Sequence, residues 1–448
     1  MSDKDKKLSS AERLSLLFDD GIYTEIDEHT GSECGAKAAF GNVGGANVFA
    51  FAQDSATADG AIDLAQSRKL ARVYDLAAKT GSPIVSIYDS NGVRFDDDSY
   101  QLLQAMSEIM RKSSELSGVV PQFAVVLGQC GGFLSLCAAL ADICVMSESG
   151  ELFLTSGFSD RAGGGNEKGV GTANFAERAG VAAVSCPTER DALLKTVELV
   201  KRFPLNNLAS LPIFDFEPVS SGVNRADVIA CVADEKSTVG IFDNLGSGAR
   251  TALATIGGVP CGVIATSGEL TRRDTAKCAR LVEICDSFSI PVVSFVDSEG
   301  LEKSADSDRL GGIRNAAKLA NVLSEATTVK VTVVTGKAIG TVYAMFCGKI
   351  GGSADMTYAW DDAVIGPMPC EIAVELLWHD RIKEQGDIAA LAAEYAKNEA
   401  SAFKAAEAGA VDAVISPDNT REIIIDAFKM LSGKRATRLP KKHGNLPL

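Results

Sequence analysis

Apolar residues recur along this chain in two patterns, one with helical spacing and one in short unbroken runs. Residues 63–79 carry apolar side chains at helical spacing and are followed by Gly81, which predicts a helix. Residues 83–88 and 123–127 are short runs rich in β-branched residues, which predict buried strands. Strands that alternate with helices in this way are typical of an α/β fold.

The same patterns predict the remaining elements of the first half and the end of the chain. Ser9 and Glu12 form a capping-box pattern, so a short amphipathic helix should open the fold. Further elements are expected at residues 48–52 (strand), 100–116 (helix), 133–141 (helix), 143–147 (strand) and 388–408 (alanine-rich helix), with an extended basic tail from Lys434.

The pattern also repeats itself at a fixed offset of 208 residues. Residues 83–93 return as residues 291–301, with six of the eleven positions identical. The register then holds for more than thirty residues, so that Gly132 aligns with Gly340. Two matches at one offset indicate a tandem duplication of a whole domain.

The length of the chain agrees with such a duplication. At 448 residues it exceeds what a single hydrophobic core usually supports. Residues 203–212 hold two prolines and no clear period, so we interpret them as a linker. We therefore expect one domain over residues 1–217 and a second over residues 218–448.

Composition excludes several classes of function. Hydrophobic residues make up 46% and charged residues 23%, as in soluble globular proteins, and the N-terminus is too polar for a secretory signal. A net charge of -15 argues against a nucleic-acid partner. The 3 histidines lack partners at ligand spacing, which argues against metal-dependent and Ser-His-Asp chemistry. The 11 scattered cysteines suggest buried free thiols in the cytoplasm.

Each copy contains a glycine-rich turn between an apolar strand and an apolar helix, at residues 128–133 and 336–342. Glycine lets a ligand approach the backbone, and the first amides of the following helix lack partners within it. Two such amides aimed at one point form an oxyanion hole. The alternative is a tight turn with nothing bound, and the duplication in register favours the functional interpretation. Neither turn carries a dinucleotide or phosphate-loop fingerprint.

At these turns the chain resembles a known family. Gly128-Gln-Cys-Gly-Gly132 and Gly336-Lys-Ala-Ile-Gly340 resemble the two glycine motifs of the carboxyltransferase subunits of biotin-dependent acyl-CoA carboxylases and decarboxylases. The likeness covers nearly the whole chain and includes residues 13–27, 120–132, 152–157, 336–343, 354–360 and 442–448. Together these segments are specific, although each alone is not.

The resemblance implies a fold and an assembly. It implies two tandem crotonase-like domains, each a spiral of β-β-α units, with acyl-CoA on the first and biotin on the second. It also implies a homo-oligomer, a dimer or a trimer of dimers, in which the first domain of one subunit faces the second domain of another. Carboxybiotin would arrive on a biotin carrier protein, with biotin carboxylase or membrane decarboxylase subunits as further partners.

The resemblance also implies roles for the two turns. The amides of Gly132 and Phe133 would hold the thioester oxygen, and the amides of Thr341 and Val342 would hold the biotin ureido oxygen. The neighbouring Gly131, Gly340, Tyr343 and Ala344 would contact the substrates. No side-chain base is required, because the biotin nitrogen itself accepts the α-proton, and this agrees with the few histidines.

The chain departs from the family at three points. The family usually has paired glycines in both turns, whereas the second member is Phe133 in one turn and Thr341 in the other. The segment 157–180 is shorter and richer in glycine than in many relatives. There is no Cys-x-x-Cys zinc ribbon, which argues against the branch that carries one.

Other functions remain open from the sequence. A crotonase-like hydratase or hydrolase would need a carboxylate beside the first turn, for which Glu148 and Glu151 are the candidates. A non-catalytic scaffold would follow if Phe133 collapsed the first oxyanion hole. Within the carboxyltransferase interpretation, a synthetic carboxylase and the soluble subunit of a sodium-pumping decarboxylase would use the same residues.

For several other features we favour structural roles. The seven-residue spacing of Cys130, Cys137 and Cys144 suggests burial along a helix more than a metal or redox site. Asp89 and Asp297 follow equivalent strands, and we expect them to cap turns. Residues 161–171 suggest a surface loop more than a cradle for CoA phosphates, and residues 272–273 a solvated face more than a CoA clamp.

Overall fold

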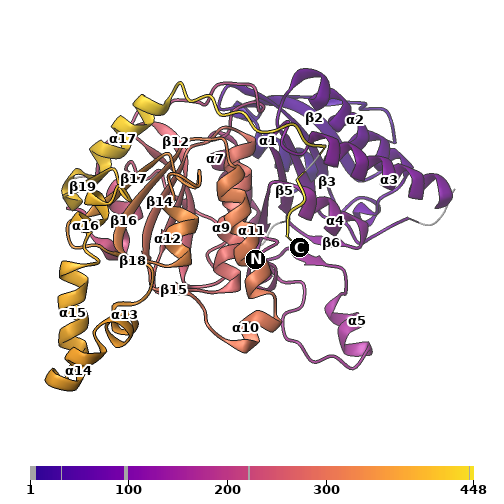
Figure 1. The fold of residues 1–448 in the computed structure, drawn as a ribbon. Helices are drawn as coiled ribbons and strands as arrows, with labels where there is room; N and C mark the ends of the chain where they lie inside the picture. Colours follow the sequence, from indigo (N-terminus) through magenta and orange to yellow (C-terminus); the bar gives the residue numbers. More distant parts are fainter. Residues whose placement is uncertain (1–6, 32, 95–98, 220–221, 443, 448) are drawn as a thin grey trace. The chain divides into compact units, whose positions relative to one another are not determined.

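The computed structural model describes residues 7–31, 33–94, 99–219, 222–442 and 444–447 (Figure 1). The chain divides into two compact units. Unit 1 comprises Met1–Pro212 together with Phe242–Asn244, and unit 2 comprises Ile213–Ile241 together with Leu245–Leu448. Each unit has a hydrophobic core of its own around a mixed sheet.

The main sheet of unit 1 has the strand order β1-β2-β3-β4-β5-β7-β9. Strands β1 to β3 pair antiparallel, and the pairs from β3 to β9 are parallel. A second small sheet pairs β6 with β8. The strands are β1 (Tyr23–Ile26), β2 (Ala36–Val43), β3 (Ala46–Gln53), β4 (Ile84–Tyr88), β5 (Gln122–Val126), β6 (Gln129–Gly131), β7 (Ile143–Ser147), β8 (Glu151–Phe153) and β9 (Val184–Cys186).

Unit 2 repeats this topology with the order β10-β11-β12-β14-β16-β17-β19. Its first three strands are again antiparallel and the others parallel, while β18 pairs with the end of β16 and β13 pairs with β15. The strands are β10 (Val239–Gly240), β11 (Ala249–Ile256), β12 (Val259–Thr266), β13 (Glu269–Leu270), β14 (Val292–Ser298), β15 (Gly300–Leu301), β16 (Lys330–Ile339), β17 (Met356–Trp360), β18 (Val364–Gly366) and β19 (Ala413–Ile415). The duplication predicted from the sequence is therefore confirmed in the topology.

Helices cover the sheets of both units (Figure 1). In unit 1, α2 packs on β2 and β3 with α3 against it, and α7 packs on β5 and β7. In unit 2, α9 packs on β11 and β12 with α11 against it. The helices of unit 1 are α1 (Ser10–Leu17), α2 (Leu64–Thr80), α3 (Ser99–Leu116), α4 (Phe133–Leu140), α5 (Gly157–Ala162), α6 (Ala173–Arg178) and α7 (Glu189–Val200). Those of unit 2 are α8 (Val228–Val232), α9 (Arg272–Ser287), α10 (Ala305–Arg309), α11 (Gly312–Glu325), α12 (Thr341–Phe346), α13 (Cys370–Leu377), α14 (His379–Gln385), α15 (Ile388–Asn398), α16 (Ala402–Glu407) and α17 (Thr420–Leu431).

Local sequence signals account for most of these boundaries. The capping box of Ser9 and Glu12 is present at α1. Asp63 caps α2 by accepting from the Gln66 amide, and Gly81 ends this helix in the left-handed conformation that glycine adopts at little cost.

One predicted helix is wrong. The segment 388–408 is not continuous, because α15 ends at Asn398 and a second helix, α16, begins after Ser401. The Ser401 hydroxyl accepts from the Lys404 amide and so caps α16. The high alanine content of the segment predicted one continuous helix and gave no sign of the cap at Ser401.

Candidate active site

The two glycine turns have the same backbone conformation. Gly132 precedes α4 with φ 57° and ψ -124°, and Gly340 precedes α12 with φ 57° and ψ -122°. Glycine reaches this region far more readily than a residue with a side chain. Each amide also donates to the neighbouring short strand, Gly132 to the Phe153 carbonyl at 3.2 Å and Gly340 to the Gly366 carbonyl at 2.9 Å. The turns are therefore equivalent in detail.

Backbone amides at the start of α4 and α12 are available to a ligand. The first amides of a helix have no acceptor within it. In the part of the chain that the structure describes, the amides of Phe133, Thr341 and Val342 have no other acceptor either. The amide of Gly132 differs, because it is bonded to Phe153. Of the two donors expected in the first turn, only that of Phe133 is therefore available.

The side chain of Phe133 does not close the first turn. It is half-buried and packs against the core of unit 1. The backbone angles of Gly132 match those of Gly340, so the bulky neighbour has not bent the turn. A Cβ placed on Gly132 would meet nothing within 4 Å, whereas one on Gly131 would lie 2.6 Å from the Phe153 ring. There is thus open space beside Gly132, whereas the Phe153 ring packs tightly against Gly131.

The second turn lies in a cavity of about 740 Å³ within unit 2. Ile339, Gly340 and Thr341 form part of its wall, and a Cβ on Gly340 would lie 3.1 Å from the Pro367 carbonyl oxygen. Charged side chains also line it, from α9 (Arg272), from α10 (Asp308) and from the chain on either side of β15 (Glu299, Glu302 and Lys303). Arg272, assigned above to a solvated face, is therefore a cavity residue, whereas Arg273 is exposed.

The other residues proposed for the second turn lie on α12. The Val342 side chain is buried in the core, and that of Ala344 is exposed. The Tyr343 hydroxyl donates to the Ala410 carbonyl at 2.8 Å, and burial raises the pKa of this phenol. Tyr343 thus has a packing partner in its own unit, at the start of the segment that leads to β19.

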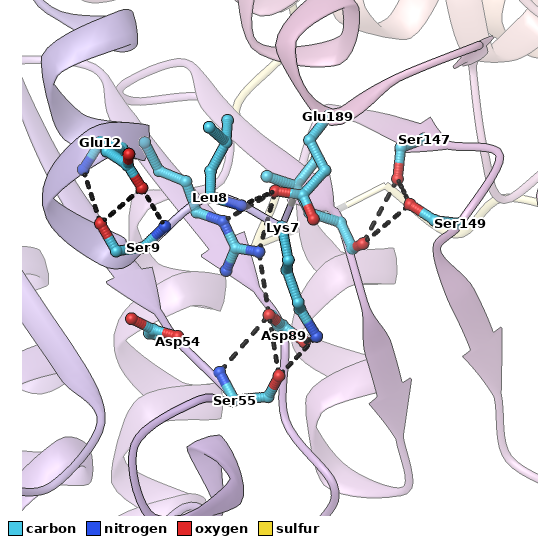
Figure 2. Close-up of polar contacts among 12 residues, drawn as sticks. Lys7, Leu8, Ser9, Glu12, Asp54, Ser55, Asp89, Ser147, Ser149 and Glu189 are labelled. Atoms are coloured by element: carbon cyan, nitrogen blue, oxygen red, sulfur yellow. Dashed lines mark hydrogen bonds and ion pairs between the residues drawn. The ribbon is translucent and has the colours of Figure 1, made fainter. Parts of the chain in front are cut away.

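The structure corrects our interpretation of Asp89 and Asp297. The side chains that cap these turns belong to the next residues: Ser90 Oγ accepts from the Gly92 amide at 3.2 Å, and Ser298 Oγ accepts from the Gly300 amide at 3.3 Å. Asp89 instead forms ion pairs with Arg13 and Lys7 (Figure 2). The repeat marked Asp89, but no local signal marked Arg13, which lies far away in the sequence.

The remaining candidates do not form a second site. Cys130 lies in β6, Cys137 in α4 and Cys144 in β7, so the three are buried as predicted but do not share a helix. All eleven cysteines belong to the described residues, and each is a free thiol. No cluster of potential metal ligands occurs among the residues that the structure describes. Glu148 and Glu151, the candidates for a hydratase, are both exposed.

Comparison with known proteins places this geometry in a family. The carboxyl transferase domain matches residues 3–446. Methylmalonyl-CoA decarboxylase subunit alpha of Veillonella parvula is 32% identical over 481 residues, covering 99% of this chain and 93% of that protein. The carboxyltransferase subunit of propionyl-CoA carboxylase from Haloferax mediterranei is 32% identical over 485 residues, covering 99% and 94%. A crystal structure of transcarboxylase 12S matches with a TM-score of 0.91 at 30% identity, covering 99% and 93%.

The fold is therefore that of tandem crotonase-like domains, as the sequence predicted. The chain belongs to the carboxyl transferase family. It is a biotin-dependent acyl-CoA carboxyltransferase, which uses acyl-CoA as substrate and carboxybiotin carried by a partner subunit. Among the described residues, no helix is both long and apolar enough to cross a bilayer.

Proposed function

We propose that this chain moves a carboxyl group between carboxybiotin on a carrier protein and the α-carbon of a short acyl-CoA. The observation that carries the proposal is the pair of equivalent turns, each with at least one unpaired amide at the start of a helix. Two oxygens must gain and lose negative charge in this reaction, one on the thioester and one on the ureido group. A separate backbone oxyanion hole for each oxygen satisfies that requirement.

In unit 1, the Phe133 amide would donate to the thioester oxygen as the acyl-CoA becomes an enolate. The space beside Gly132 supports this assignment, since no atom lies within 4 Å of a Cβ placed there. The half-buried Phe133 side chain packs away into the core and leaves that approach open. The positive end of the α4 dipole adds to the stabilisation of the enolate.

In unit 2, the amides of Thr341 and Val342 would donate to the ureido oxygen. The cavity of about 740 Å³ around Gly340 supports this assignment, because its volume lies within the range usual for small-molecule sites. Carboxybiotin supplies both the carbon dioxide and the nitrogen that then accepts the α-proton. The described residues that line the cavity include no histidine, which agrees with a reaction that needs no side-chain base.

The proposed assembly follows from the assignment of the thioester oxygen to unit 1 and of the ureido oxygen to unit 2. We propose a homo-oligomer, a dimer or a trimer of dimers, in which the first turn of one subunit serves with the second turn of another. The solved transcarboxylase 12S, which is described as a hexamer, supports this. Biotin carboxylase or a membrane decarboxylase subunit would form or decarboxylate the carboxybiotin on the carrier protein. The free thiols support a cytoplasmic location.

The proposal is tested by supplying each substrate separately and then together. Biocytin stands in for the carrier, and methylmalonyl-CoA is the carboxyl donor because relatives of this chain are named for it. The expected result is that propionyl-CoA forms only when both are present, and that each alone raises the melting temperature. Stabilisation by CoA esters alone, with water addition to a crotonyl-CoA probe, would instead establish a hydratase.

A further inference from the structure

A buried ion network lies at the carboxyl end of β4, close to the first turn (Figure 2). Asp89 is only 1% exposed and Arg13 is fully buried. Arg13 Nη2 lies 2.9 Å from Asp89 Oδ2 and 3.0 Å from Glu189 Oε2, so it joins two carboxylates. Lys7 Nζ lies 3.0 Å from Asp89 Oδ1. Two cations and two carboxylates thus neutralise each other around a buried Arg13–Asp89 pair, while the Lys7 side chain is 48% exposed.

Asp89 differs from Glu189 in what else it holds. Its Oδ2 accepts from the Ser55 hydroxyl at 3.2 Å and from the Ser55 amide at 3.4 Å, which fixes the loop after β3. Its backbone carbonyl lies 2.2 Å from the place where a Cβ on Gly60 would be, so this loop packs directly on it. Among the residues that the structure describes, Glu189, at the start of α7, forms polar contacts only with Arg13 and the Leu8 amide.

The same carboxylate lies against the beginning of the first turn. A Cβ on Gly128 would lie 1.9 Å from Asp89 Oδ1, so the carboxylate lies directly over the Gly128 backbone. From the other side, the Ser147 and Ser149 hydroxyls donate to the Leu127 carbonyl at 3.4 and 3.3 Å (Figure 2). The backbone that leads through β6 to Gly132 is therefore held between a carboxylate and two hydroxyls.

Unit 2 provides an independent example of this arrangement. A Cβ on Gly336 would lie 2.2 Å from Asp297 Oδ1, and the same oxygen accepts from the Lys337 amide at 2.8 Å. The backbone amide of each aspartate donates to a side chain at the end of the neighbouring strand of the sheet, Gln53 Oε1 of β3 in unit 1 and Thr266 Oγ1 of β12 in unit 2. A carboxylate placed over the first glycine of the turn is thus a shared feature of both copies.

We propose that Asp89 is a positioning residue for carboxyl transfer: its carboxylate fixes the backbone at Gly128 and thereby the place of the Phe133 amide. This inference rests on the proposed function, because it presumes that the Phe133 amide is an oxyanion donor. The network suits the role, since an anion between Arg13 and Lys7 has little freedom to move. Burial alone would raise the pKa of Asp89, but these cations hold the pKa below its usual range, so the carboxylate is ionised at neutral pH.

The test compares Asp89→Asn with Glu189→Gln in the full-length chain. Both changes neutralise a carboxylate on the same Arg13 nitrogen. At neutral pH Asp89→Asn should lower the melting temperature more than Glu189→Gln, because folding lowers the pKa of Asp89 and raises that of Glu189. Only Asp89→Asn should lower kcat, by about 100-fold, because a displacement of about 1 Å of a catalytic group has an effect of this size. KM for the acyl-CoA should change by less than about threefold, since the loss of an interaction made mainly in the transition state lowers kcat without weakening substrate binding.

A second variant guards against simple loss of folding. Asp89→Glu retains the charge opposite Arg13, but its extra methylene cannot fit over Gly128, so kcat should fall although the ion pair persists. Amide hydrogen exchange of residues 128–134 should accelerate in Asp89→Asn and Asp89→Glu, but not in Glu189→Gln. This measurement needs no substrate, so it stands even if the wild-type chain proves inactive as a carboxyltransferase.

The outcomes separate the two proposals. Faster exchange in the turn without any wild-type carboxyl transfer would overturn the proposed function and leave the positioning by Asp89 intact. An active wild type whose kcat is unchanged in Asp89→Asn would overturn the positioning role. Equal losses of kcat in Asp89→Asn and Glu189→Gln would also overturn it, because the effect would then come from the charge network alone.

Discussion

The two glycine turns share a backbone but not their surroundings. Gly132 and Gly340 have nearly identical angles, and each donates to a neighbouring short strand. The first turn is open to space on the side where a Cβ would lie, whereas the second lies in a cavity whose wall comes within 3.1 Å of that position. Duplication has therefore preserved the backbone geometry, while the elements around each turn have diverged.

The aspartates that contact the two turns, Asp89 and Asp297, also differ in their surroundings. Asp89 lies between Arg13 and Lys7, and the Asp89 and Arg13 side chains are almost completely buried. Asp297 is half-buried and lines a cavity of about 320 Å³, where the nearby Arg225 pairs instead with Asp362. In both copies an aspartate contacts a glycine backbone. Among the described residues, cations pair with this aspartate only in the first copy.

The comparison is tested most severely by removing the arginine on each side. Arg13→Met leaves Asp89 and Glu189 buried without their shared cation, so unfolding should become easier by about 3–5 kcal/mol. Arg225→Met should cost at most about 1 kcal/mol, because its side chain is 40% exposed and that of Asp362 is 63% exposed. Urea unfolding by circular dichroism measures both; tryptophan fluorescence reports unit 2, which contains Trp360 and Trp378. Equal losses of stability in the two variants would contradict the distinction between the buried ion pair of Asp89 and the exposed ion pair of Arg225.

Deleting one amide from each turn tests whether both turns are catalytic. Phe133→Pro and Thr341→Pro each remove the first amide of a helix, a position where proline is tolerated. Each should reduce carboxyl transfer by about 100- to 1000-fold, the effect of losing one oxyanion donor. Thr341→Ala keeps the amide and should be nearly silent in the same assay. If Thr341→Ala proved as damaging as Thr341→Pro in a folded protein, the hydroxyl would be functional and the backbone mechanism in unit 2 wrong.

Adding a methyl group to each glycine separates backbone strain from crowding. Gly132→Ala should cost about 1–3 kcal/mol of folding free energy, since alanine must adopt a positive φ with no contact to relieve or worsen it. Gly340→Ala should cost more, because its Cβ would also press on the Pro367 carbonyl. Denaturant midpoints of the two variants give the order. The opposite order would mean that the open space beside Gly132 is filled.

The pH dependence of stability should differ in sign between the two carboxylates on Arg13. The pKa of Asp89 is lowered on folding, so its contribution is present above about pH 4 and is lost as the pH falls through the folded value. Burial raises the pKa of Glu189, so its contribution is present at low pH and is lost as the pH rises through the folded value. The stability difference between wild type and Asp89→Asn should therefore shrink on acidification, whereas that for Glu189→Gln should shrink on raising the pH. Parallel slopes would refute the assignment.

Sequence patterns accounted for the elements near the site because their signals are local. The apolar runs before residues 128 and 336 placed two strands, and the repeat offset placed Gly132 and Gly340 at matching turns. The same reasoning misjudged Cys130, Cys137 and Cys144, because a seven-residue spacing also arises when a chain passes through strand, helix and strand. The roles of the predicted site residues stay predictions until the variants are measured.

The sequence by itself determined the duplication, the α/β class and the two glycine turns, because period and glycine conformation depend on neighbouring residues. Tertiary structure alone decided that the Gly132 amide donates to the Phe153 carbonyl, that Phe133 packs against the core, and that Gly340 lines a cavity. It also decided that Arg13 lies between Asp89 and Glu189, residues separated from it by 76 and 176 positions. Coulomb and packing forces act through space, so no local pattern can report which distant side chains they bring together.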